Sequence, residues 1–228
     1  MCGTATTKPL LLYDSPVTTL ADQAYRILLE DIVTLKLQPG EVLAEEDLRR
    51  RLDLGRTPIR EALQRLASER LVVVIPRKGV IVSEINITDL GEIYEVRETM
   101  EGLAARLAAE RFGAGPLPPE VTADLAALGH ADDFLALIAL DRRLHRAIHG
   151  LARNSYLMST LDWHFNLSCR LVLSATRRLP VAPVAELSET MMDFHQQFAA
   201  ICAGEARRAE DLARRHSGFS ERMLRRTI

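Results

Sequence analysis

The stretch that decides the fold runs from Leu43 to Val82 and reads LAEEDLRRRLDLGRTPIREALQRLASERLVVVIPRKGVIV. Apolar residues recur at helical spacing over 45–52 and again over 57–68. The turn Asp53-Leu54-Gly55 separates these two segments. In the second segment, Thr57 suits the N-cap and Pro58 suits the first turn. The stretch therefore begins with two short helices joined by a tight turn.

A β-hairpin is predicted after the second helix. Residues 71–75 and 79–83 are rich in β-branched side chains, and the basic segment Pro76-Arg77-Lys78 joins them. An earlier helix is expected to begin at Thr19, because Thr19 and Asp22 resemble a capping box followed by an apolar stripe. Three helices followed by a hairpin with a basic tip outline a winged helix-turn-helix.

The helix over 57–68 has two faces that suit DNA recognition. Ile59, Leu63 and Leu66 lie on one side, while Arg56 and Arg60 lie on the other side near the N-terminal end. A recognition helix buries one face and presents donors on the other, and arginine can bind guanine through two hydrogen bonds. We therefore expect DNA contacts from Arg49, Arg56, Thr57, Arg60, Arg77, Lys78 and Gly79.

Charge is distributed unevenly along the chain. The formal net charge is −2, but basic residues clearly outnumber Asp53, Glu61 and Glu69 between positions 49 and 78. A DNA-binding protein must be basic where it meets phosphate and need not be basic overall. A solvated basic surface would give the same charge, so it is the order of helices and hairpin that favours DNA.

The composition favours a cytoplasmic protein with no membrane span. Hydrophobic residues make up 47% and charged residues 26% of the 228 residues, which is ordinary for a globular protein. No apolar run approaches the roughly 20 residues that a membrane helix needs, and no secretory signal is visible. Reduced thiols are expected, because three cysteines stand far apart, at Cys2, Cys169 and Cys202.

The sequence predicts a mainly α fold with two domains. Residues 1–17 are expected to form a flexible arm, residues 18–84 the winged helix-turn-helix with its small β-hairpin, and residues 85–228 an all-α helical bundle for effector binding and dimerisation. A linker is expected over 84–88. The bundle helices are predicted near 90–112, 120–128, 131–151, 155–178, 184–203 and 205–226.

The segment GRTPIREALQRL, followed by a strand, a basic tip and a glycine, resembles the winged helix-turn-helix of the GntR family of bacterial transcription regulators. The resemblance implies that Arg56, Thr57, Arg60 and Gly79 occupy DNA-contact positions. The turn departs from the family pattern, with Asp53 where glycine is usual and Gly55 where serine is usual. Glu46 stands where the family often has a basic residue, which leaves one phosphate or base contact without its cation.

Several histidines of the helical half fall near apolar positions. Asp141 and His145 are one helical turn apart, and His195 and His216 lie on two later helices. A carboxylate and three imidazoles directed into a helical core would suit Zn²⁺, Ni²⁺ or Mn²⁺. Each histidine could equally be a hydrogen-bonded core residue. His149 is also one turn from His145, so spacing alone does not choose the ligand set.

The helical half resembles the FCD effector-binding domain of the FadR subfamily. The matching elements are IYEVRETMEGLAARLAAE, DRRLHRAIH, the ARNSYL that follows, and isolated histidines on the last two helices. With the winged half, the likeness covers nearly the whole chain after residue 18. Metal-binding members have one aspartate and three histidines, and the resemblance maps these onto Asp141, His145, His195 and His216.

Arg97 shares a helical stripe with Ile93 and Met100, so its guanidinium is predicted to face inward. It would either form an internal salt bridge with Glu101 or anchor a carboxylate effector, and the resemblance favours the effector role. Asn166 and Arg170 are further candidates for the same effector cavity.

These features predict a homodimeric transcription regulator, most simply a repressor. Its partners would be a double-stranded DNA operator and a small carboxylate effector, and its cofactor a divalent metal ion. The main alternative is a metal-dependent hydrolase or lyase with an appended DNA domain. No HExxH motif and no activated serine or cysteine supports that alternative, so no enzymatic activity is expected. A second alternative is a DNA-binding protein without an effector, whose histidines only pack.

Overall fold

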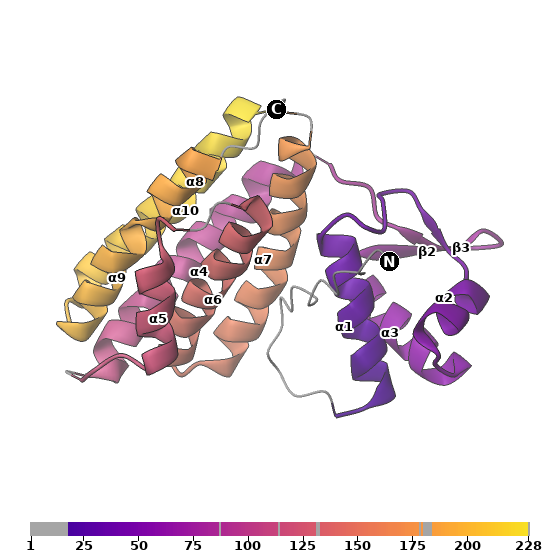
Figure 1. Cartoon of the computed structure of the whole chain (residues 1–228), viewed down its shortest axis with the longest axis horizontal. Coiled ribbons are helices and arrows are strands. Elements are labelled where there is room, and N and C mark those ends of the chain that lie inside the picture. The colour runs from indigo at the N-terminus through magenta and orange to yellow at the C-terminus, as the bar shows by residue number, and fades with distance from the viewer. Residues whose placement is uncertain are drawn as a thin grey trace, which may run out of the picture.

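The computed structural model describes residues 18–86, 88–113, 115–130, 133–177, 179 and 184–227. These residues form two parts that lie side by side, here named the winged half (18–86) and the helical half (88–227) (Figure 1). The expected N-terminal arm, residues 1–17, lies outside the described residues. The predicted fold class is confirmed: a winged helix-turn-helix with a small sheet precedes an all-helical bundle.

Helix α1 (Leu20–Val33) begins where the sequence predicts. Thr19 is its N-cap, and the Thr19 hydroxyl oxygen accepts a hydrogen bond from the Asp22 backbone N–H at 3.0 Å. Such a cap satisfies one of the free N–H groups in the first turn. The buried face of α1, which includes Leu28 and Ile32, packs against the third helix of the winged half.

The helix-turn-helix consists of α2 (Glu45–Leu52) and α3 (Arg56–Ser68). Asp53 ends α2 with φ of 52°, in the left-handed region that aspartate tolerates better than most residues. The expected N-cap of α3 was wrong by two positions. Gly55 is the N-cap, so Thr57 lies inside the first turn of the helix rather than capping it.

The sheet of the winged half contains one more strand than the sequence predicts. Strand β2 (Val72–Ile75) and strand β3 (Gly79–Val82) form the expected antiparallel hairpin. Strand β1 (Val42–Leu43) pairs with the other side of β3, so the order is β1-β3-β2. At the hairpin tip Arg77 has φ of 67° and Gly79 has φ of 94°, and glycine adopts such a backbone at little cost.

The helical half is built around a long central helix, α4 (Asp89–Phe112). Helix α4 packs against α6 (Phe134–Leu151), α7 (Ser155–Thr176), α9 (Asp193–Cys202) and α10 (Ala206–Thr227). Two shorter helices, α5 (Pro119–Ala127) and α8 (Val184–Met191), pack against α6. The single helix expected over 184–203 is therefore two helices, α8 and α9, which meet at Met192.

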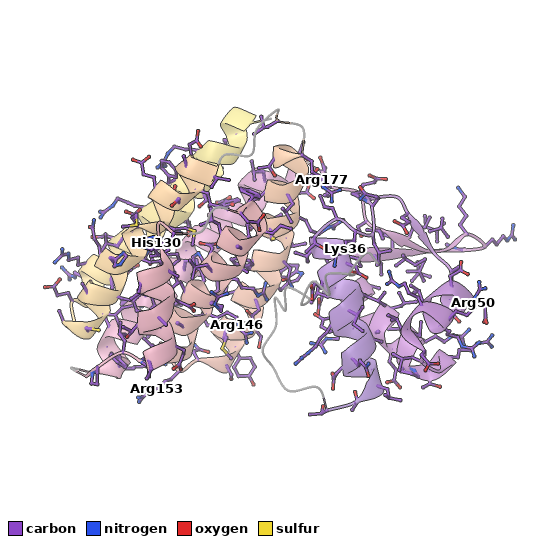
Figure 2. All side chains as sticks on the ribbon, viewed as in Figure 1. Lys36, Arg50, His130, Arg146, Arg153 and Arg177 are labelled. Carbon is purple, nitrogen blue, oxygen red and sulfur yellow. The ribbon has the colours of Figure 1, made fainter. Side chains whose placement is uncertain are left out.

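Hydrogen bonds from α7 and from its C-cap, Arg177, connect the two halves. The Trp163 indole Nε1 donates to the Glu69 carbonyl at 2.8 Å, and Arg170 Nη2 donates to the Ser83 carbonyl at 2.8 Å. Near the end of α7, Arg177 Nη2 donates to the Thr34 carbonyl at 3.2 Å; Figure 2 labels Arg177 at this boundary. Helix α7 is therefore the part of the bundle that positions the winged half.

None of the helices among the described residues has the length and apolar character that crossing a bilayer requires.

Candidate functional site

The first candidate site is the exposed face of α3. Ile59 and Leu66 are fully buried on one side of α3, whereas Arg56, Thr57 and Arg60 are exposed on its first two turns. The apolar face fixes the helix on the winged half, and the arginine face is left free for a partner. This is the division that the sequence predicts for a helix that enters the major groove of DNA.

A carboxylate on α2 organises the two arginines of α3. Arg60 Nε lies 2.9 Å and 3.0 Å from the two carboxylate oxygens of Glu45, and Arg56 Nε lies 3.9 Å from one of them. Sequence reasoning missed Glu45, because the pairing joins residues that are 15 positions apart. The hydrogen bonds between Glu45 and Arg60 among the described residues use Nε, which leaves the terminal nitrogens of the guanidinium available to a base edge.

The remaining expected DNA contacts lie on the same half of the molecule. Arg77, Lys78 and Gly79 are exposed at the hairpin tip between β2 and β3. Arg49 on α2 is partly exposed and forms an ion pair with Glu46 at 2.8 Å. Glu46 is the acidic residue at a position where the family often has a basic one, so here it partly neutralises its neighbour.

The second candidate site is a buried cluster in the helical half. Asp141 and His145 come from α6, and His216 comes from α10. Asp141 Oδ1 lies 3.6 Å from His145 Nε2 and 3.8 Å from His216 Nε2. One donor atom from each of the three residues lies within 4.8 Å of the others. The structure therefore brings three of the four expected metal ligands together.

The fourth expected ligand, His195, does not join this group. Its side chain is exposed on α9, whereas the preceding residue, Phe194, is fully buried. The Phe194 ring centroid lies 5.0 Å from that of His145 and 4.8 Å from that of His216. Because neighbouring helix positions differ by about 100° in direction, only Phe194 faces the cluster. The expected ligand set is thereby reduced to Asp141, His145 and His216.

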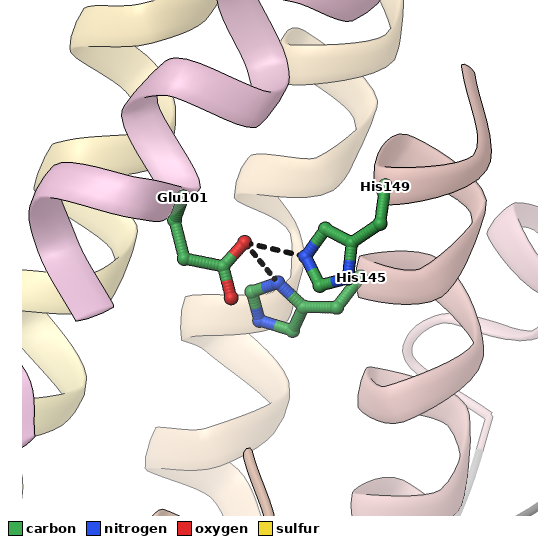
Figure 3. Close-up of side chains that lie close together, drawn as sticks. All are labelled: Glu101, His145 and His149. Carbon is green, nitrogen blue, oxygen red and sulfur yellow. Dashed lines mark hydrogen bonds and ion pairs between the residues drawn. The ribbon is translucent and has the colours of Figure 1, made fainter. Parts of the chain in front are cut away.

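A second carboxylate supports the cluster from α4. Glu101 Oε2 lies 2.8 Å from His149 Nε2 and 3.2 Å from His145 Nδ1, and Figure 3 shows both histidines of α6 directed at this one carboxylate. All three side chains are buried. Sequence reasoning considered Glu101 only as a partner of Arg97, because its contacts with His145 and His149 join positions 44 and 48 apart. Glu101 fixes the orientation of the His145 ring from the side opposite Asp141.

Burial and neighbouring charges set the protonation states of the cluster. Burial lowers the pKa of His145 and outweighs the attraction of Glu101 and Asp141, so this imidazole is neutral at pH 7. Burial alone would raise the pKa of Asp141, but its interactions with His145, His216 and Arg97 lower it overall. The pKa of Glu101 likewise lies well below its usual value, because His145 and His149 outweigh burial. Neutral imidazoles and ionised carboxylates are the forms that bind metal ions.

The geometry of Asp141, His145 and His216 fits a divalent transition metal. Metal bonds of about 2.0–2.2 Å at tetrahedral angles separate ligand atoms by roughly 3.5 Å, close to the separations that join Asp141 Oδ1 to the two Nε2 atoms. His216 Nδ1 is buried and has no hydrogen-bond partner among the described residues. Two imidazoles and one carboxylate are also a donor set that such metals accept.

Arg97 lies beside these donors, as its inward-facing stripe predicts. Its side chain is buried, with Nε 3.4 Å from Glu101 Oε1 and Nη2 3.2 Å from His145 Nε2. The rings of Tyr94 and Phe165 enclose the guanidinium. Both roles considered for Arg97 thus remain open: it pairs with Glu101, and its charge stands next to the atoms that could hold a metal.

The three expected effector residues do not share one cavity, which corrects that expectation. Arg97 lines a small space of about 30 Å³ beside Asp141 and Cys169. Asn166 accepts a hydrogen bond from Arg142 at 2.9 Å and lines a separate cavity of about 310 Å³. Arg170 lines a third cavity of about 270 Å³. Asn166 and Arg170, one turn apart on α7, line cavities shared with residues of the winged half, whereas the cluster residues come from α6 and α10.

Comparison with known protein families agrees with this two-part architecture. A family model described as "Bacterial regulatory proteins, gntR family" matches residues 20–82. A second model, described as "FCD domain", matches residues 92–218. The chain belongs to the GntR family. As a GntR protein with an FCD domain, it has the FadR-like architecture that the sequence resemblance implies.

Curated relatives of this GntR protein are transcription regulators. The HTH-type transcriptional repressor GlaR of Escherichia coli K12 is 33% identical over 204 residues, which cover 84% of this chain and 90% of the relative. The HTH-type transcriptional repressor RspR of the same strain is 34% identical over 95 residues, 42% of each chain. This GntR protein is accordingly a DNA-binding transcription regulator. Both of these relatives are named as transcriptional repressors.

Solved structures share the fold of this GntR protein. Escherichia coli McbR/YncC superposes with a TM-score of 0.78 at 24% identity, covering 92% of this chain and 99% of the other. A putative GntR transcriptional regulator from Rhodococcus sp. RHA1 gives a TM-score of 0.68 at 23% identity, covering 90% and 96%. At this level of identity the likeness extends to the fold alone.

Proposed function

We propose that this GntR protein is a homodimeric, ligand-responsive repressor that binds a divalent metal and a small carboxylate in its helical half. The observation that carries the proposal is the convergence of Asp141, His145 and His216 from two helices into one buried group. Isolated buried histidines serve packing as often as function. Two histidines and a carboxylate with their donor atoms directed at one point favour a ligand role.

DNA binding in this proposal uses α3 and the hairpin tip. Arg56 and Arg60 reach base edges in the major groove, while Lys78 and its neighbours contact the adjacent backbone or minor groove. A two-fold dimer presents two such surfaces, so the expected operator is a pseudo-palindrome with one half-site for each subunit. The name of the relative GlaR, a transcriptional repressor, supports a role in repression rather than activation.

The metal in this proposal is held by Asp141, His145 and His216. A bound Zn²⁺, Ni²⁺ or Mn²⁺ would supply positive charge and open coordination positions to an oxygen ligand. Glu101 Oε2 lies 3.2 Å from Nδ1, the other ring nitrogen of His145, which leaves Nε2 directed toward the ligand group. His195 takes no part in this set, because its side chain is exposed.

Arg97 is the second recognition group for a carboxylate effector. A guanidinium binds a carboxylate through two parallel hydrogen bonds, and Arg97 lies 3.2 Å from His145 Nε2. The space beside Arg97 and Asp141 is only about 30 Å³, so an effector larger than a water molecule requires these side chains to move apart. Binding that opens the cluster gives the effector different affinities for two conformations, and only such a difference can change DNA affinity.

Metal content and thermal stability test the proposal. Protein prepared without a histidine tag should contain close to one divalent metal per chain, and chelation followed by Zn²⁺ or Ni²⁺ should restore its melting temperature. The Asp141→Asn and His216→Ala variants should lose the metal, while His195→Ala, the matched control on the exposed face of α9, should keep it. A metal-free preparation that gains no stability from any of the three ions would refute the metal site.

The effector part has its own test. A screen of small carboxylates should reveal one that changes the affinity of the metal-loaded protein for its own promoter, measured by fluorescence anisotropy. His145→Ala should weaken that response while leaving operator affinity without effector unchanged. An unchanged response in His145→Ala would place the effector elsewhere.

A further inference from the structure

A second cavity lies between the winged half and the helical half, away from the histidine cluster. It measures about 270 Å³ and is lined from three directions. Glu84 and Ile85 come from the segment after β3, Ile93 comes from α4, and Trp163, Leu167 and Arg170 come from α7. This volume is enough for a small organic molecule, and the proposed function makes no use of it.

Arg170 supplies a buried positive charge to this cavity. Its side chain is almost fully enclosed, with 3% of its surface exposed, and its Nη2 donates to the Ser83 carbonyl. Its Nε is buried without a hydrogen-bond partner, and no carboxylate within 4.0 Å forms an ion pair with it, both among the described residues. Burial lowers the pKa of Arg170 to about 10, so the group is still charged at pH 7. Glu84 attracts this charge from the same cavity lining without forming an ion pair within 4.0 Å. An enclosed charge so weakly paired is costly to the fold, which favours a bound anion.

The rest of the lining limits what that anion can be. Ile93, Leu167 and Leu171 form an apolar wall on α4 and α7. Glu84, Asp89 and Glu92 also line the cavity, and all three are exposed. Exposed carboxylates at the opening repel a ligand that carries several negative charges, whereas an apolar wall stabilises a hydrocarbon body. The lining therefore suits one negative charge on an apolar molecule.

We propose that the cavity between the two halves binds a small monocarboxylic acid with an apolar aliphatic or aromatic body, whose carboxylate pairs with Arg170. The apolar body lies along Ile93 and Leu167. This site is separate from the metal cluster, so it neither needs the proposed metal nor shares a ligand group with it.

The position of the site connects it to the DNA-binding half. Arg170 already holds the Ser83 carbonyl, and Glu84 and Ile85 belong to the segment that leads from β3 toward α4. A molecule bound here touches both halves at once. It therefore shifts operator affinity whenever the two halves lie differently in the DNA-bound and free proteins.

Calorimetry on the full-length protein tests the site with benzoate and hexanoate as probes, and with citrate and phosphate as polyanion controls. Benzoate or hexanoate should bind with millimolar affinity or better, and at least tenfold more tightly than citrate or phosphate. Arg170→Gln should weaken binding of the monocarboxylate at least tenfold. Removal of divalent metal with a chelator should leave it unchanged.

A second variant keeps the proposal testable if Arg170→Gln does not fold. Val96 lines the cavity and is 44% exposed, so Val96→Trp should fill the opening without disturbing a buried group. It should weaken benzoate binding, while Val74→Trp, the same substitution at an exposed valine on β2, should not. The proposal is overturned by absence of benzoate and hexanoate binding, by equal binding of citrate, by normal binding in both cavity variants, or by loss of binding when divalent metal is removed with a chelator.

Discussion

Arg60 on α3 donates its Nε hydrogen to both carboxylate oxygens of Glu45 on α2, at 2.9 Å and 3.0 Å. The pair joins the two helices of the helix-turn-helix at the surface, where Arg60 is 57% exposed. An exposed ion pair of this kind contributes little to folding stability. Its effect is to hold a flexible guanidinium in one direction before any partner arrives.

Replacing Arg60 tests its role as a base-reading residue. Arg60→Ala should weaken binding to the operator by ~1–3 kcal/mol, because one bidentate hydrogen-bonded contact to a base is lost. Binding to random duplex should change much less. Fluorescence anisotropy at fixed salt concentration measures both affinities, and an equal loss on both DNAs would mean that Arg60 contacts only phosphate.

Glu45 should act through Arg60 rather than by contacting DNA. Removing its charge in Glu45→Gln should raise affinity for random duplex, since a negative charge leaves the DNA-facing surface. It should also lower the ratio of operator to random affinity, because Arg60 is no longer held in place. Glu46→Gln is the matched control: Glu46 pairs with Arg49 at 2.8 Å, and its loss should raise both affinities without changing their ratio.

Lys78 at the hairpin tip should contribute to affinity without contributing to sequence preference. Lys78→Ala should weaken binding to all duplexes to a similar extent and reduce the salt slope of binding by ~1. A salt titration of operator and random DNA gives this slope directly. A selective loss on operator DNA would instead assign base recognition to Lys78.

The winged half depends on the buried face of α3. Leu66 is fully buried, so Leu66→Ala should lower the free energy of unfolding by ~2–5 kcal/mol through lost transfer energy and the cavity left behind. Gln64→Ala, at an exposed position of the same helix, should have little effect. Urea denaturation compares the variants, and equal stability of the two would mean that the site collapses around the smaller side chain.

Glu101 should be essential to the stability of the helical half. Glu101→Gln removes the carboxylate that faces Arg97, His145 and His149. Breaking a buried ion pair by neutralising one partner lowers stability by ~3–5 kcal/mol, because the other charge stays buried. Glu95→Gln, at an exposed position of α4, is the control. A stable Glu101→Gln protein would show that Arg97 finds another counter-charge.

The winged half was largely predictable because its signals are local. The Thr19 cap, the periodicity of Ile59 and Leu66, and the β-branched runs around Pro76 all act within a few residues. Strand β1 was missed because two residues give no periodicity, and only pairing with β3 makes them a strand. The N-cap of α3 is Gly55 rather than the predicted Thr57, because Gly55 has an extended backbone and the helix begins at Arg56.

The histidine cluster was only partly predictable, because the orientation of α9 determines whether His195 can join it. His195 and Phe194 are adjacent, and the break at Met192 between α8 and α9 decides which of them faces His216. The contacts of Glu101 with the two histidines and of Glu45 with Arg60 were missed, because contacts between distant positions produce no periodic pattern in a sequence. The same limit applies to Arg170, whose cavity exists only because two halves meet.

Trp163 is the single tryptophan of the chain. Its indole ring spans the boundary, with Nε1 bonded to the Glu69 carbonyl of the winged half. The intrinsic fluorescence of Trp163 in the unlabelled protein therefore reports on the boundary between the two halves. A red shift of the Trp163 emission maximum on addition of DNA or an acid would show that water has entered between the two halves. An unchanged emission maximum would show that the boundary stays closed.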